Sequence, residues 1–190
     1  MRRLMMMFGV ILLSATTFVS ASAVSVSANT EEFVANKTGK TTGKQINPQV
    51  FKTGAGTIEC TTVTSTGKIE EPLKFTAHKE VLTYSGCSGF GTSLTVTPAH
   101  FEFLANKTAR LEKTVTISSE SLTCKVLLEP QTLNNVNYTN SSGKLIASAT
   151  VTGIHSLPTG GMCGSKENTE GSYSGKIEAE LEGGTVEWKS

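Results

Sequence analysis

Apolar and polar residues alternate along most of the chain after Glu31. A period of two is typical of β-strands that bury one face, because successive side chains point to opposite sides of a strand. No helical period continues over three turns, so the pattern predicts an all-β fold of about ten strands. The clearest alternating stretches are residues 101–103, 115–117, 122–128, 145–151, 173–181 and 186–188.

Glycine-containing turn sequences separate the predicted strands. They are Thr66-Gly67-Lys68, Ser142-Gly143-Lys144 and Gly183-Gly184, at points where a hairpin needs positive φ. Short connections favour antiparallel neighbours. We therefore predict an antiparallel two-sheet sandwich, Greek-key or immunoglobulin-like, in preference to a barrel, although the alternation itself is compatible with both.

One short segment occurs twice. Residues 32–38 (EFVANKT) and 102–108 (EFLANKT) match at six of seven positions, and each copy precedes a cysteine in a strand and then a cysteine in a glycine-rich segment. The repeat suggests that the sandwich arose from two duplicated halves. Chance recurrence of a strand-then-turn pattern is the alternative, because the rest of the two halves aligns poorly.

The first 28 residues have the pattern of a secretory signal peptide. Arg2 and Arg3 form a basic start, residues 4–13 form an apolar run, and cleavage is expected after Ala23 or Ala28. A retained membrane anchor is the alternative, but glycine and hydroxyl residues interrupt the ~20 apolar residues that a span needs. Residues 29–190 are predicted to form a single secreted domain with no transmembrane anchor after cleavage.

The charge of the mature chain excludes several classes of protein. Loss of Arg2 and Arg3 reduces the 17 basic residues to 15, against 16 acidic ones, so the net charge is close to −1. Arg110 is the only remaining arginine and the lysines are scattered, so no nucleic-acid partner is predicted. Every acidic residue is glutamate, which argues against a Ser-His-Asp triad, an aspartic dyad and an EF-hand.

Four cysteines follow the leader, and export favours their oxidation to disulfides. Four joined cysteines allow three pairings. Cys60 and Cys124 lie in predicted strands, whereas Cys87 and Cys163 lie in glycine-rich segments that can bend to meet them. We predict the structural disulfides Cys60–Cys87 and Cys124–Cys163, with four buried thiols as the alternative.

With these features in this order, the chain resembles a paralogous group of uncharacterised secreted four-cysteine β-rich proteins of actinobacteria. The resemblance rests on the Thr/Ser/Gly-rich body, on the segments Ser85-Gly86-Cys87 and Gly161-Met162-Cys163-Gly164, and on the closing residues 183–188. It covers essentially the whole mature chain. It implies an extracellular β fold, and it provides no catalytic residue to transfer.

Few residues are candidates for chemistry. His78, His100 and His155 are too scattered for metal-ligand spacing, so no metal and no cofactor is predicted. Residues 39–45 approach a phosphate-binding loop but are one residue short, and residues 65–68 have S-x-x-K spacing without a helix; both are interpreted as turns.

A hydrolase could still form if Glu80 or Glu102 met a histidine in space. Binding of polysaccharide would usually need exposed aromatic rings, and the available rings are Trp188, Tyr84, Tyr138 and Tyr173. Trp188 is expected in the core, because it shares a strand face with Val186.

The sequence therefore predicts a secreted, non-catalytic protein with a binding or structural role at the cell envelope. A cell-wall or other extracellular polymer is a candidate partner. A secreted hydrolase using Glu/His chemistry is the alternative.

Overall fold

The computed structural model describes residues 30–160, 163 and 167–190; the predicted leader, residues 1–28, lies outside them. The described residues form fifteen β-strands and no α-helix, which confirms the all-β prediction. The strands are β1 (Glu32–Ala35), β2 (Gly39–Thr53), β3 (Gly56–Ile69), β4 (Lys74–Phe75), β5 (Ala77–Gly89), β6 (Thr92–Val96), β7 (Ala99–Leu104), β8 (Thr108–Leu111), β9 (Val115–Ser119), β10 (Cys124–Leu128), β11 (Gln131–Leu133), β12 (Val136–Ser141), β13 (Lys144–Thr159), β14 (Asn168–Leu181) and β15 (Val186–Lys189).

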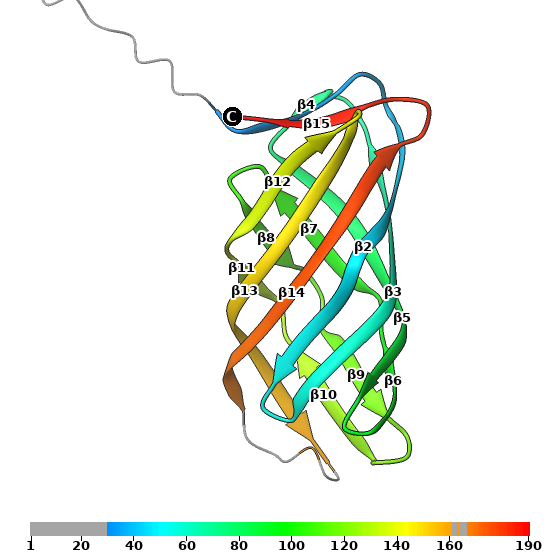
Figure 1. Ribbon diagram of the computed structural model, residues 1–190. Helices are drawn as coiled ribbons and strands as arrows, with labels where there is room; N and C mark the ends of the chain where they lie inside the picture. The colour runs from blue at the N-terminus through cyan, green and yellow to red at the C-terminus, as the bar shows by residue number, and fades with distance from the viewer. Residues whose placement is uncertain (1–29, 161–162, 164–166) are drawn as a thin grey trace, which may run out of the picture.

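Eight strands close into an antiparallel barrel (Figure 1). The ring runs β5–β3–β2–β14–β13–β10–β9–β6, and it closes because β6 pairs with both β9 and β5. The predicted Greek-key or immunoglobulin-like sandwich is therefore wrong. A sandwich and a barrel both bury one face of each strand, so the alternation in the sequence cannot distinguish them.

Long, irregular strands explain why the sheet closes. β2, β3, β13 and β14 are 14 to 16 residues long, and register shifts interrupt the pairing of β2, β13 and β14 with their neighbours. Such bulges increase local twist and bend a strand, which lets long strands coil around a common axis.

The turn predictions have mixed outcomes. Ser142 and Gly143 both have positive φ and connect β12 to β13, and Gly183, with a φ of 62°, lies between β14 and β15. Both turn predictions are confirmed. The predicted turn at residues 66–68 is wrong, because these residues lie inside β3, and residues 39–45 likewise lie inside β2.

The two copies of the repeated segment occupy unlike positions. Residues 32–35 form β1, which lies between β15 and β4 in a separate three-stranded sheet, whereas residues 102–104 belong to β7, which lies between β5 and β8. The hypothesis of two duplicated half-sandwiches is therefore wrong.

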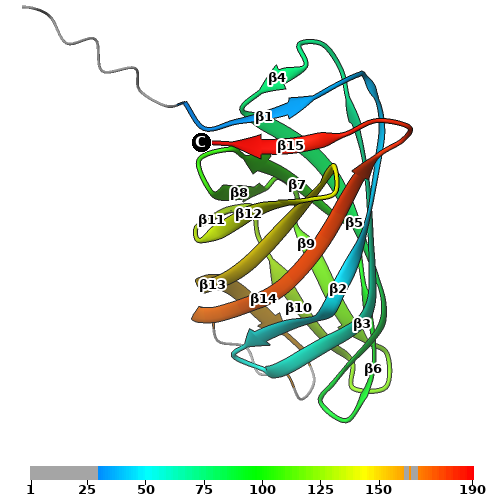
Figure 2. The ribbon, with the colours of Figure 1, turned by 45° about the horizontal axis from the view of Figure 1, so that its top comes forward.

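The two ends of the barrel differ. The sheet of β15, β1 and β4 lies across one end, which we call the capped end (Figure 2). Its core includes Phe33, Ile69 and Leu181. Beside it, β7, β8, β11 and β12 lie outside the eight-strand ring and extend the barrel wall in this half of the molecule. Val136 N donates to Lys107 O (3.0 Å), where β12 meets the turn between β7 and β8.

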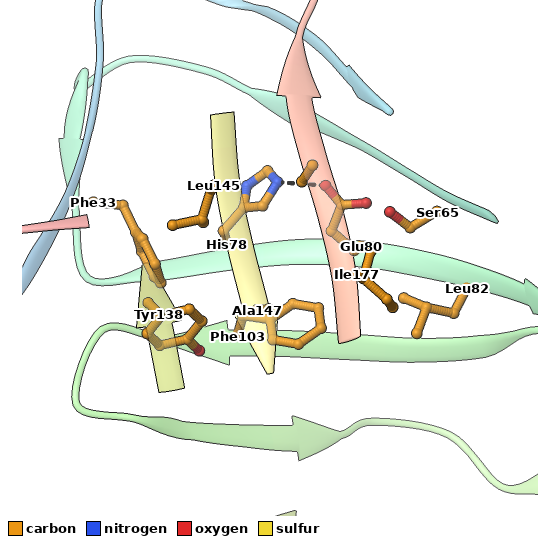
Figure 3. Close-up of a pocket in the computed structure, with 11 residues that line it drawn as sticks. Phe33, Ser65, His78, Glu80, Leu82, Phe103, Tyr138, Leu145, Ala147 and Ile177 are labelled. Atoms are coloured by element: carbon orange, nitrogen blue, oxygen red, sulfur yellow. Dashed lines mark hydrogen bonds and ion pairs between the residues drawn. The ribbon is translucent and has the colours of Figure 1, made fainter. Parts of the chain in front are cut away.

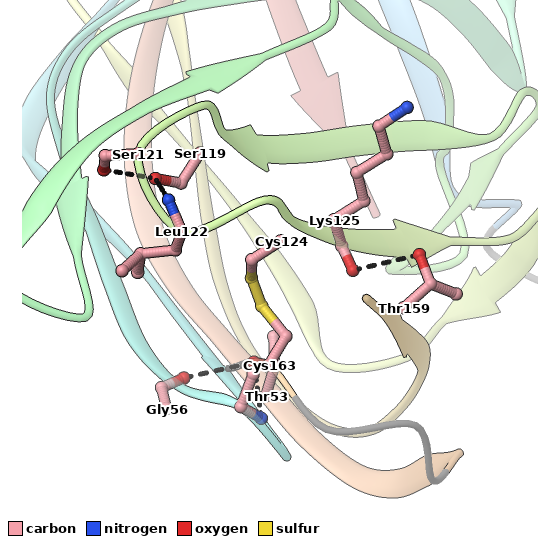
Figure 4. Close-up of a disulfide and its surroundings, with 10 residues drawn as sticks. Thr53, Gly56, Ser119, Ser121, Leu122, Cys124, Lys125, Thr159 and Cys163 are labelled. Atoms are coloured by element: carbon pink, nitrogen blue, oxygen red, sulfur yellow. Dashed lines mark hydrogen bonds between the residues drawn. A yellow bond between two sulfur atoms is a disulfide. The ribbon is translucent and has the colours of Figure 1, made fainter. Parts of the chain in front are cut away.

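Both disulfides belong to the larger core at the opposite end, which we call the disulfide end. Cys60–Cys87 joins directly opposed residues of β3 and β5, and Cys124–Cys163 ties β10 to the segment between β13 and β14 (Figure 4). These are the two pairs expected from the sequence, and they fit an oxidising compartment.

A search of residues 30–190, where described, finds no helix suited to crossing a membrane.

Candidate functional site

The candidate site is an internal cavity in the capped half of the molecule. Two adjoining hollows share Leu82, Phe103, Ala147 and Ile177 in their walls, and each offers about 30 Å³ to the centre of a water-sized sphere. A single water needs about 10–15 Å³ and a benzene molecule occupies a cavity of about 150 Å³, so each hollow admits only a very small guest. We call the pair the interior cavity.

Its walls are almost entirely apolar. Ser65, His78 and Glu80 make up a polar end, and aromatic or aliphatic side chains and small residues make up the rest. The apolar lining residues are Phe33, Leu82, Phe101, Phe103, Ala109, Leu133, Val136, Tyr138, Leu145, Ala147, Ala149, Tyr173, Gly175, Ile177 and Ala179.

Strand register places the polar end. Thr41 of β2 is opposite Gly67 of β3, and Gly67 is opposite Glu80 of β5, so the three residues form one row across the barrel wall. A Cβ on Gly67 would lie 2.7 Å from Thr41 Oγ1 and 2.9 Å from Glu80 Oε1. The glycine therefore lets two side chains from non-adjacent strands meet above it, which explains its place inside a strand.

Hydrogen bonds join three side chains at this end, and Figure 3 shows the contact between two of them, His78 and Glu80. Thr41 Oγ1 donates to Glu80 Oε1 at 2.6 Å, and His78 Nε2 lies 2.9 Å from the same oxygen and 3.2 Å from Thr41 Oγ1. His78 and Glu80 are two positions apart on β5, so they share its inward face. Glu80 is only 4% exposed.

The pKa of Glu80 is lowered in spite of its burial. Burial is the largest influence and by itself raises the pKa of a carboxyl group. Hydrogen bonds from His78 and Thr41, electrostatic attraction to the His78 ring and the Ser65 hydroxyl together outweigh it. Glu80 is therefore an ionised carboxylate at neutral pH.

One oxygen of this carboxylate has no partner. Oε1 receives the bonds from Thr41 and His78, but Oε2 is buried without a hydrogen bond from any described residue. Figure 3 shows Ser65 on the side of Glu80 away from His78. A buried, unpaired carboxylate oxygen is costly, because it has lost hydration without replacement.

A surface groove adjoins the polar end. It has about 310 Å³ open to the centre of a water-sized sphere, and it is lined by residues 68–72, Phe75 and residues 77–79. His78 lines both this groove and the interior cavity, and its ring is 5.8 Å from that of Phe75. His78 thus separates the interior from the groove.

The cluster lacks the geometry of a hydrolytic triad. In such a triad the histidine uses different ring nitrogens for the nucleophile and for the carboxylate. Here Nε2 faces both Thr41 and Glu80, and the Thr41 hydroxyl donates to the carboxylate. His78 therefore does not accept the threonine proton, and Thr41 is not activated as a nucleophile.

The other candidate acids and histidines are separate from this site. Glu102 pairs with Arg110 at 2.9 Å. His155 is 3.7 Å from Glu167, and both side chains are largely exposed. His100 does not line the interior cavity. Among the described residues, no group of three or more His, Cys, Asp or Glu side chains is placed to hold a metal ion.

The tyrosines and the tryptophan do not form an exposed platform. Tyr84, Tyr138 and Tyr173 are buried, and burial raises the pKa of all three hydroxyls. Trp188, expected in the core, is partly buried and packs against the core of the capped end, and its Nε1 donates to Ala105 O at 2.8 Å. The aromatic rings therefore stabilise the interior instead of presenting a surface for sugars.

Sequence reasoning found only part of the site. The sequence suggests that Glu80 or Glu102 could meet one of the three histidines, but it identifies neither His78 as that histidine nor Thr41 and Ser65 as neighbours. The available signal was the H-x-E spacing on one strand, which places both side chains on one face. The neighbours from β2 and β3 depend on register, which the sequence does not give.

Comparison of the chain with family models, curated proteins and solved structures finds no match.

Proposed function

We propose that this is an extracellular, non-catalytic protein that binds a small, mainly apolar molecule in its interior cavity. The observation that carries the proposal is the contrast between the two halves of the barrel interior. Ile58, Ile117 and Val126 fill the disulfide half and are at most 1% exposed. In the capped half, inward positions hold small residues and leave space.

The small residues come from neighbouring strands. Ala147 and Ala149 are on β13, and Gly175 and Ala179 are on β14. Large aliphatic side chains at the three alanine positions would fill the cavity. An empty apolar space loses dispersion contacts and destabilises a protein, so keeping it is best explained by an occupant.

The extracellular part of the proposal is supported by two features. The disulfides fit an oxidising compartment, and residues 1–28 have the pattern of an export signal. A polymer ligand has less support than a small molecule, because the aromatic rings face inward. A hydrolase also has less support, because His78 and Thr41 lack the nucleophile–base arrangement described above.

Nuclear magnetic resonance would test the binding directly. Xenon is a single neutral atom that enters apolar protein cavities, so it suits hollows of about 30 Å³ each. Its titration into the protein should shift the methyl signals of Leu82, Leu145 and Ile177, which line the cavity. The methyl signals of Ile117 and Val126 at the disulfide end should stay in place.

A filling substitution supplies the control. Ala147→Leu places a larger side chain in the wall shared by both hollows, so xenon affinity should fall at least about tenfold. Thr150→Leu adds similar bulk on the exposed side of β13 and should leave affinity unchanged. Absence of shifts in the unsubstituted protein, or equal binding by the Ala147→Leu variant, would contradict the proposal.

A further inference from the structure

We infer that small molecules reach the interior cavity through a seam between β11 and residues 150–156 of β13, and that the side chain of Gln131 holds this seam closed. The inference rests on the proposed function and adds the route by which a guest enters. It starts from the strand pairing around the cavity, because a guest passes through a barrel wall only where two neighbouring strands part.

At the seam, two strands lie side by side without a ladder. β13 pairs with β12 as far as Ala149 and with β10 from Leu157 onwards. Between these points β13 lies beside β11, which pairs only with β8 among the described strands. Leu133 of β11 and Ala149 of β13 lie on the two sides of the seam, and both line the interior cavity. The seam therefore borders the space that a guest would occupy.

The side-chain amide of Gln131 takes the place of the missing ladder. His155 N donates to Gln131 Oε1 at 2.9 Å, and Gln131 Nε2 donates to His155 O at 3.1 Å. Two directly opposed residues of an antiparallel ladder exchange the same two kinds of bond. Gln131 Nε2 also donates to Glu129 O at 3.0 Å, which orients the amide. One side chain thus joins strands that backbone pairing would join over several residues.

The stretch of β13 at the seam is also irregularly paired along its other edge. Its pairing with β14 shifts register twice, between Thr152 and Ile154 and between Ile154 and Ser156. Gly153, which has a φ of 75°, and His155 are exposed. Bulges interrupt a ladder, and segments with exposed backbone hydrogen bonds open at lower free energy than the whole fold. This stretch can therefore move outward when the Gln131 bonds break.

The polar end of the cavity is a more costly place to open. His78 separates the interior from the surface groove, but it bonds the ionised carboxylate of Glu80 and lies 3.2 Å from Thr41 Oγ1. Hydrogen bonds to a charged group contribute more than bonds between neutral groups. The neutral amide of Gln131 is therefore the weaker closure, which favours the seam as the route.

Xenon exchange measured by nuclear magnetic resonance tests the route. In Gln131→Ala, the rates of xenon entry and exit should both rise about tenfold, because two hydrogen bonds across the seam are lost. Xenon affinity should stay within about twofold of the unsubstituted value, since Gln131 does not line the cavity. If Gln131→Ala does not fold, Gln131→Met keeps the bulk of the side chain without its amide and should give the same acceleration.

Gln45→Ala is the matched control. Gln45 Nε2 donates to Thr61 O between β2 and β3, which a ladder joins, and Gln45 does not line the cavity. This variant also loses a bond from a glutamine side chain to a backbone carbonyl, but away from the seam. Its xenon entry and exit rates should equal those of the unsubstituted protein.

The outcomes separate the route from the binding function. If xenon binds but its rates are unchanged in the Gln131 variants, the seam is not the route and the apolar binding function stands. Equal acceleration by Gln45→Ala would also overturn the inference, because the effect would then be a general loosening of the wall. If xenon does not bind the unsubstituted protein, both proposals are wrong.

Discussion

At the scale of single residues, the site depends on the absence of a side chain at Gly67. Thr41 and Glu80 are two strands apart, and they touch only because Gly67 between them has no side chain. Gly43 has a similar place opposite Ser65, where an added Cβ would collide with the serine hydroxyl. These glycines create the polar end by making space within a continuous strand.

The ionisation of Glu80 predicts a dependence of stability on pH. Its folded-state pKa is below the usual value of 4.5. A group of this kind stabilises the fold at pH values above its unfolded pKa, and the contribution is lost as the pH falls through the folded pKa. Glu80→Gln should therefore lower the free energy of unfolding by about 1–3 kcal/mol at pH 7, and the difference from the unsubstituted protein should shrink below pH 4.5.

Urea unfolding at a series of pH values would measure this difference. Other carboxyl groups with lowered pKa values, such as Glu70 and Glu180, are present in both proteins and cancel. A gap between the two proteins that stayed constant from pH 7 to pH 3 would show that Glu80 does not stabilise the fold through its charge.

At the scale of strands, the sequence predicts local structure well and pairing poorly. The alternating stretches correspond to β7, β9, β10, β13, β14 and β15, because burial of one strand face is a local property of the pattern. Gly67 was assigned to a turn because glycine in a polar segment usually marks one. Its role in the wall depends on β2 and β5, whose register is set by contacts distant in sequence.

The disulfides constrain these elements to different degrees. Cys60–Cys87 links strands that are already paired, at a sequence separation of 27, whereas Cys124–Cys163 has a sequence separation of 39 and fixes a connection between strands. Loop-closure entropy predicts about 3.5–4 kcal/mol for each bond. Replacing either pair with alanine should therefore lower the free energy of unfolding by about 2–5 kcal/mol.

Urea denaturation of the two double-alanine variants, compared with the oxidised protein, would test this. The folded structure should persist in the Cys60→Ala, Cys87→Ala variant, because the β3–β5 ladder continues on both sides of the bond. A loss of less than about 1 kcal/mol in both variants would contradict a major stabilising role for the disulfides.

At the scale of the molecule, the closed ring explains why the sequence suggested the wrong architecture. Residues 87–89 of β5 pair with β6, while residues 77–82 of the same strand pair with β7. β13 also divides its partners, between β12 and β10. A strand that changes partner along its length allows one sheet to close at the disulfide end and to widen around the interior cavity at the capped end. The alternation along each strand is unchanged by this choice.

The cap sheet closes the wider end, and Trp188 anchors it. The indole nitrogen donates to Ala105 O, and the Asn140 side chain bonds both the backbone nitrogen and the carbonyl oxygen of Trp188 at 2.9 and 2.8 Å. The ring also lies 6.2 Å from that of Tyr138, which lines the interior cavity. The cap is thus attached to the wall of the barrel through these bonds and through buried residues such as Phe33 and Val186, whereas both disulfides belong to the core at the other end.

Replacing this anchor should loosen the cap without opening the barrel. Peripheral elements that no disulfide links to the main core can open locally, at lower free energy than the whole fold. In Trp188→Ala, backbone amides of β1 and β15 should exchange with solvent at least about tenfold faster, while amides around Ile117 and Val126 keep their slow exchange. Trp188→Phe keeps an aromatic ring but not the bond to Ala105, so its effect should be intermediate. Hydrogen–deuterium exchange followed by mass spectrometry resolves the two ends; equal acceleration at both would mean that the cap and the disulfide end unfold as one unit.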